Sequence, residues 1–245
     1  MDDRCMERTN NRKKKNRRIR AVICAAAVIA GLVFLISCKS SNEGEPGIRI
    51  LISEQTMQDG TIIQIPEFKA DREETQKNIR DLEKETKNLQ KMVDKAQRRG
   101  KHMEMRCYLN EEKNYPQVTV VWYPSEEETR LYDLVTLGVD MREEVPITCK
   151  EALEKTGLTG VDLSLAVGRL AQESGIRGEL TSTEMQGFRL DENGDVREIY
   201  MKLILETVTE NGEQEEITTT EEHFFSYDPK ENKLVRLSEE GFDIP

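Results

Sequence analysis

The sequence predicts an α+β fold in which one long amphipathic helix packs on an antiparallel or mixed sheet, after a signal or anchor segment. Three observations indicate this. Runs of β-branched residues between turn signals recur along the chain, and the last third is typical of a β-meander. Between Asp71 and Arg98, apolar residues recur at spacings of three and four. From Ala21 to Cys38 the chain is apolar enough to leave water.

The N-terminus joins a basic run to this apolar one. Residues 1–20 contain nine lysines and arginines against three acidic residues, a net charge of +6, and residues 21–37 carry no charge. At a rise of about 1.5 Å per residue, the apolar run is at the short limit for a helix that spans a bilayer core of about 30 Å. A basic start followed by an apolar stretch is also typical of a secretory signal. We therefore predict a signal peptide or a membrane anchor over residues 1–37.

Four residues at the end of the apolar run, Leu35-Ile36-Ser37-Cys38, resemble the lipobox of bacterial lipoproteins. The resemblance implies that the peptide is cut between Ser37 and Cys38, and that the thiol of Cys38 carries a diacylglyceryl lipid. Residues 38–47 are polar and have the composition of a flexible tether. The alternative is an uncleaved helix over 21–37 in which Cys38 has no role, and the long basic start keeps that alternative open.

Charge indicates which side of a membrane the body occupies. The whole chain has a net charge of −11, so residues 38–245 carry −17. Because basic segments stay on the cytoplasmic side, we expect the body outside the cytoplasm, attached to the cell membrane. An acidic body argues against nucleic acid, which is bound through clustered lysines and arginines. The expected partners are the membrane, through Cys38 or the 21–37 helix, and an envelope protein or glycan.

Two strands open the body, and the long helix follows them. The runs 48–52 and 61–66 predict a hairpin. Asp71, with Glu74 three residues later, indicates the start of the helix, and Gly100 follows its end. The apolar stripe consists of Ile79, Leu82, Thr86, Leu89, Val93 and Ala96. The stripe fits either a dimeric coiled coil or a helix laid across a sheet, and its threonine and short length favour the sheet.

Three strands and then two short helices are predicted after Gly100. They are expected as strands over 103–109, 118–123 and 131–139, and as helices over 149–155 and 161–174. Thr148 is predicted to cap the first of these helices, and Gly157 to end it. The inward positions of the second are expected to be Val161, Leu165, Leu170 and Ala171. With the meander, residues 48–245 are predicted to form one extracytoplasmic α+β domain.

This order of elements, together with the run from Leu134 to Thr148, resembles the extracytoplasmic domains of RsiV-like anti-sigma factors and of related deacetylase-associated domains. The runs 187–190 and 224–227 fall where that family has its late strands. The resemblance implies a shared fold over about residues 60–240 and, in that family, sensing of lysozyme. The chain departs from the family pattern over residues 124–129, where a glycine-rich turn ending in histidine is missing. The recognition role of that turn is therefore not carried over, and the basic N-terminus is too short for a sigma-binding domain.

No pattern predicts a catalytic set, a metal site or a cofactor. His102 and His223 do not have the spacing of metal ligands to each other or to the body cysteines. Among 47 acidic residues, pairs of carboxylates are expected by chance. The body cysteines, Cys107 and Cys149, leave two alternatives: a disulfide in an oxidising compartment, or two small buried side chains.

These patterns together predict a non-catalytic, membrane-anchored envelope lipoprotein whose body binds or senses a partner outside the cell. One alternative is a single-pass membrane sensor with an uncleaved anchor. Another is an accessory domain of a cell-wall hydrolase or deacetylase. A concave face lined with exposed Trp122 and Tyr123 would favour recognition of a sugar or a protein.

Overall fold

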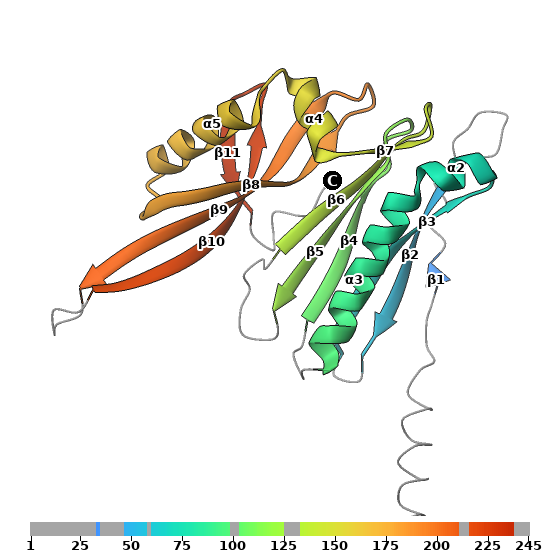
Figure 1. Ribbon diagram of the computed structural model, residues 1–245, viewed down its shortest axis with the longest axis horizontal. Coiled ribbons are helices and arrows are strands. Elements are labelled where there is room, and N and C mark those ends of the chain that lie inside the picture. The colour runs from blue at the N-terminus through green and yellow to red at the C-terminus, as the bar shows by residue number, and fades with distance from the viewer. Residues whose placement is uncertain are drawn as a thin grey trace, which may run out of the picture.

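The chain folds into two β-sheets that pack against each other, with helices on their outer faces (Figure 1). The computed structural model describes residues 33–34, 47–57, 60–98, 103–124, 133–210 and 216–237. One sheet is mixed and the other antiparallel, which confirms the α+β class. The prediction of one sheet is wrong. The chain forms a second sheet because the run VTVVWY at residues 118–123 has apolar side chains on both faces and is therefore covered on both sides.

The first sheet has seven strands that follow one another in sequence order. They are β1 (Val33–Phe34), β2 (Ile48–Thr56), β3 (Ile62–Ala70), β4 (Met103–Asn110), β5 (Gln117–Pro124), β6 (Asp133–Asp140) and β7 (Val145–Ile147). Neighbours pair antiparallel except β3 and β4, which pair parallel at Ile63 and Met105. A parallel pair needs a long crossover, and the helices α2 (Glu73–Asn78) and α3 (Arg80–Arg98) supply it.

The predicted single helix from Asp71 to Arg98 is divided at Ile79. The backbone of Ile79 leaves helical geometry, at φ −87° and ψ 7°, while its side chain is fully buried. The break therefore falls at a residue whose side chain is anchored in the core. The predicted cap is also wrong, because the N-cap of α2 is Arg72, without a side-chain cap, and the carboxylate of Asp71 accepts a hydrogen bond from Arg49.

The apolar stripe of α3 lies on the first sheet. Leu82, Leu89 and Val93 belong to one buried cluster with strand residues such as Val120 and Trp122, here called the α3 cluster. Figure 1 shows α3 running along the face of this sheet. The stripe therefore covers a sheet within the chain, and the coiled-coil alternative is not what the structure has.

The second sheet is the predicted meander, and two helices cover its outer face. Its strands are β8 (Glu179–Leu190), β9 (Val196–Glu210), β10 (Glu216–Asp228) and β11 (Lys233–Arg236), each antiparallel to the next. Helices α4 (Cys149–Thr156) and α5 (Gly160–Glu173) pack on it through a cluster that includes Ala152, Leu163, Val167 and Ile199.

The starts of both helices follow from capping boxes. Thr148 accepts a hydrogen bond from the backbone N–H of Glu151, as predicted, and Thr159 does the same for Asp162. Gly157 ends α4 in left-handed geometry, at φ 74°. The predicted inward positions of α5 are partly wrong, because the side chains of Val161 and Leu165 are each 69% exposed.

A third cluster, here called the seam, joins the two sheets. It consists of Val121, Tyr123 and Leu134 from the first sheet and Tyr200 and Phe224 from the second. Since side chains alternate across a strand, these residues face away from the helices, and the layers follow as α3, first sheet, second sheet and α4–α5. Small residues allow the close approach: a Cβ atom at Gly187 would lie 2.9 Å from Cβ of Thr136.

Candidate functional site

The predicted lipidation and cleavage sites, Cys38 and Ser37, lie outside the described residues, as do His102 and most of segments 1–37 and 38–47. Of segment 1–37, the structure describes Val33–Phe34, which pairs with β2 at the edge of the first sheet. The last tether residue, Gly47, is described and belongs to the fold, because its carbonyl accepts a hydrogen bond from the Asp71 N–H at 3.2 Å. Within the described residues, no helix combines the length and apolarity needed to cross a bilayer.

The two body cysteines are free thiols in different places. Cys107 packs against the α3 cluster, and Cys149 packs against the cluster under α4 and α5. The Cys107 thiol donates to the Gln64 carbonyl at 3.4 Å. Burial raises the pKa of both thiols. Of the two alternatives open from the sequence, the structure has partly buried thiols and no disulfide between them.

Trp122 and Tyr123 do not form an exposed aromatic surface. Both side chains are buried, and they point to opposite faces of β5, Trp122 into the α3 cluster and Tyr123 into the seam. A sugar-stacking surface made of these two residues is therefore excluded.

His223 lies on β10, and both of its ring nitrogens form hydrogen bonds. Arg236 donates to Nδ1 at 2.8 Å, so Nε2 carries the proton that it donates to Glu221 at 3.0 Å. This arrangement leaves no ring nitrogen for a metal ion or for accepting a proton from a substrate. No group of three or more metal-ligating side chains occurs within the described part of the chain.

A lysine lies between the sheets beside the seam. The side chain of Lys202 is 13% exposed, and its Nζ pairs with Glu222 at 2.9 Å and lies 5.8 Å from the ring centroid of Phe224. Burial alone would lower the pKa of Lys202, but Glu222 and Asp133 outweigh burial and raise it. Asp133 is the opposite case, because burial raises the pKa of its carboxyl more than Lys202 lowers it. Glu222 and Asp133 thus favour the charged form of Lys202, whereas burial disfavours the charged form of Asp133.

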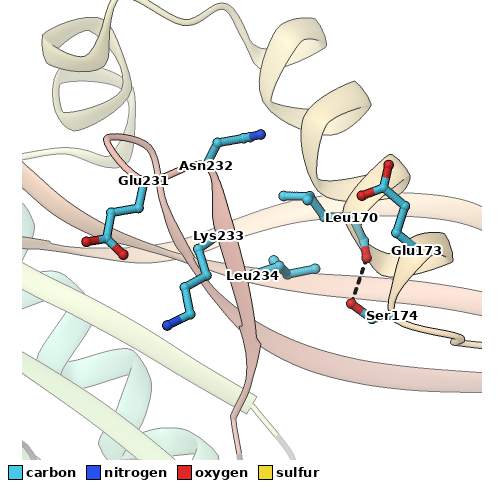
Figure 2. A pocket seen from close by; sticks show the side chains of 7 residues that line it. All are labelled: Leu170, Glu173, Ser174, Glu231, Asn232, Lys233 and Leu234. Carbon is cyan, nitrogen blue, oxygen red and sulfur yellow. Dashed lines mark hydrogen bonds between the residues drawn. The ribbon is translucent and has the colours of Figure 1, made fainter.

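A hollow of about 410 Å³ lies between the end of α5 and β11 (Figure 2). Its lining residues are Leu170, Glu173, Ser174, Glu231, Asn232, Lys233 and Leu234. Figure 2 shows Leu170 and Leu234 in the space between the helix and the strand, with Glu173 and Ser174 on the helix side and Glu231 and Lys233 extending away from the helix. The size falls in the range of small-ligand sites, although most of the lining side chains are exposed, so the hollow is shallow.

The lining of this hollow offers apolar and polar groups that can contact a ligand. Its only hydroxyl, on Ser174, donates to the carbonyl of Leu170 at 2.8 Å, so it is not paired with a base that would activate it. The lining contains neither histidine nor cysteine. The two leucines, with Glu173 beside them, suit a ligand that has an apolar body and a polar end. Sequence reasoning missed this site, since Ser174 and Glu231, the residues of its two walls that are nearest in sequence, are 57 positions apart and only the meander brings them together.

Comparison of the chain with protein-family models, with curated proteins and with solved structures finds no match. The resemblances to the lipobox and to the RsiV-like domains therefore stay predictions from the sequence.

Proposed function

We propose that this chain is a membrane-anchored envelope lipoprotein whose body acts outside the cytoplasm as a non-catalytic binding or sensing module. The observation that carries the proposal is the position of Leu35-Ile36-Ser37-Cys38 at the end of the apolar run. A lipobox needs a cysteine immediately after an apolar signal segment, and Cys38 occupies that place.

The charge distribution supports the same orientation. The +6 N-terminus would stay on the cytoplasmic side, and the −17 body would lie on the other side. Residues 39–46, between the lipid and Gly47, would hold the body near the bilayer surface.

The polar groups of the body support binding in preference to catalysis. His223 is held between Arg236 and Glu221, and Ser174 donates to a backbone carbonyl. Both cysteines are partly buried with raised pKa values, which suppresses the reactive thiolate. The hollow between α5 and β11 is the place that we assign to a ligand.

Metabolic labelling with palmitate tests the anchor. The wild-type chain is expected to incorporate label and to lose residues 1–37, and Cys38→Ala is expected to abolish both. Cys24→Ala, which changes a cysteine inside the apolar run, serves as the matched control and should be labelled and cleaved normally. Full-length, unlabelled protein in the membrane fraction would overturn the lipoprotein and favour the uncleaved single-pass anchor.

A further inference from the structure

Two cations from separate elements converge on one aromatic ring. Arg142 lies in the turn between β6 and β7, and Lys155 lies in the last turn of α4. The Cζ atom of Arg142 is 5.7 Å from the ring centroid of Tyr115, and the Nζ atom of Lys155 is 5.6 Å from it. Tyr115 is buried, and a Cβ atom at Gly194 would lie 2.6 Å from its Cζ atom, so the ring is closely held.

Neither cation forms an ion pair with any residue that the structure describes, whereas other cations in the same region do. On the same helix as Lys155, Lys150 pairs with Glu154 at 3.7 Å. In the β8–β9 turn that contacts the ring, Asp195 pairs with Lys230 at 3.2 Å, and Asp191 with Arg197 at 3.0 Å. Asp191 and Asp195 of that turn therefore pair with other cations and not with Arg142 or Lys155, while Glu192, the third acidic residue of the turn, is exposed.

Two positive charges that lie within 6 Å of the same ring and have no ion pair among the described residues repel each other, and a bound anion would relieve that repulsion. A guanidinium matches phosphate oxygens in a two-point hydrogen bond, and an ammonium adds a compact charge. A phosphate with two negative charges balances both cations, whereas a carboxylate balances only one. Both side chains are exposed on flexible stems, so they can turn toward the same small anion.

We propose that Arg142 and Lys155 form a binding site for a phosphate group beside Tyr115, as free phosphate or as a phosphomonoester. The site is separate from the hollow between α5 and β11, and it does not depend on lipidation of Cys38. Its occupant comes either from solution or from the headgroup of a lipid monophosphate. The net charge of the body disfavours long polyanions, which would meet many carboxylates.

Residue-resolved acetylation of the full chain in non-ionic detergent tests the site. The acetylation rates of Lys155 and Lys150 are measured by peptide mass spectrometry with and without inorganic phosphate at constant ionic strength. At a phosphate concentration about four times its dissociation constant, Lys155 is expected to react about fivefold more slowly, because the free fraction falls by that factor. Lys150, on the same helix, should be unaffected.

Variants test whether Arg142 and Lys155 bind phosphate together or whether phosphate affects Lys155 alone. Arg142→Gln should remove the protection of Lys155 while leaving Lys155 itself intact. Arg169→Gln, which removes an exposed cation paired with Glu173, should leave the protection unchanged. Equal slowing of both lysines, undiminished protection in Arg142→Gln, or no slowing of Lys155 with any phosphate source would overturn the proposal.

Vesicles identify the source of the phosphate. Protection of Lys155 by phosphatidylcholine vesicles that contain phosphatidic acid, and not by soluble phosphate, assigns the site to a lipid headgroup. Protection by inorganic phosphate in detergent assigns it to a soluble phosphate group.

Discussion

The side-chain oxygen of Gln117 accepts a hydrogen bond from the backbone N–H of Leu190 at 2.7 Å, and this contact joins the two sheets. Gln117 begins β5, and Leu190 ends β8. The amide nitrogen of Gln117 donates to the carbonyls of Tyr115 and Leu190. The Gln117 side chain is only 1% exposed, so water cannot replace these bonds. A buried amide thus supplies hydrogen bonds where the edge strand β8 crosses β5.

Replacing this amide should destabilise the fold strongly. Gln117→Leu keeps an apolar side chain of similar size but leaves the N–H of Leu190 buried without a partner. We expect the free energy of unfolding to fall by about 2–4 kcal/mol, measured by urea denaturation followed by circular dichroism. Gln172→Leu, at an exposed position of α5, should change it by less than about 0.5 kcal/mol. Equal effects of the two changes would contradict this role for Gln117.

The contact between Gly187 and Thr136 gives a second prediction, which concerns packing. Gly187→Ala adds a methyl group that would meet Cβ of Thr136 at 2.9 Å and its backbone nitrogen at 3.2 Å. The strands must separate to accept it, so we expect a loss of about 1–3 kcal/mol in the free energy of unfolding. Thermal and urea unfolding of the variant and the parent measure it.

A glycine with open space around it provides the control for that variant. Gly160, at the start of α5, has no atom within 4 Å of an added Cβ. Gly160→Ala should leave stability unchanged or raise it by about 0.5–1 kcal/mol, because alanine favours the helix. A Gly187→Ala protein as stable as the parent would show that the sheets are not in close contact there.

Local signals in the sequence located the strands well but did not reveal how many sheets they form. The turns, the meander and the Thr148 cap follow from residues close in sequence, and the structure has them. The division of the strands into two sheets depends on long-range contacts such as Gln117 with Leu190, 73 residues apart. The apolar residues on both faces of β5 were the signal for a second covering layer.

The candidate sites were harder to predict than the fold. Val161 and Leu165 follow a helical apolar spacing, yet both are exposed, because Leu163 and Val167 supply the buried face of α5. The hollow between α5 and β11 and the cations beside Tyr115 each combine segments that are distant in sequence. The residues of these sites follow no recognisable spacing in the sequence, so only the tertiary structure reveals them.

The third prediction concerns the thiols. Burial raises the pKa values of Cys107 and Cys149, so the reactive thiolate is scarce at pH 8 in the folded protein. Iodoacetamide should label both residues at least about tenfold more slowly in the native protein than in urea, because labelling requires opening of the fold. Peptide mass spectrometry measures the rates. A change in mass on reduction alone would reveal a disulfide and contradict the free thiols.

The fourth prediction follows from Asp133, whose pKa is raised because burial disfavours its charged form. The folded protein therefore holds a proton on this carboxyl at pH values where the unfolded chain has already lost it. As pH rises from about 4 through the raised pKa, Asp133 becomes a partly buried negative charge in the folded protein. The free energy of unfolding therefore falls. Lys202 offsets part of this effect, while Glu222 and Glu184 add to it.

Asp133→Asn isolates the contribution of this carboxyl, because the amide oxygen can still accept the Leu134 N–H bond that Asp133 accepts at 3.0 Å. Relative to the parent, the variant should become more stable as pH rises from 4 to 7.5, measured as urea midpoints at several pH values. Glu192→Gln, at an exposed turn position, is the control and should show no such trend. A stability difference that stays constant with pH would mean that Asp133 ionises as readily in the fold as in the unfolded chain. The ionic group beside Lys202 would then be open to water instead of enclosed between the sheets.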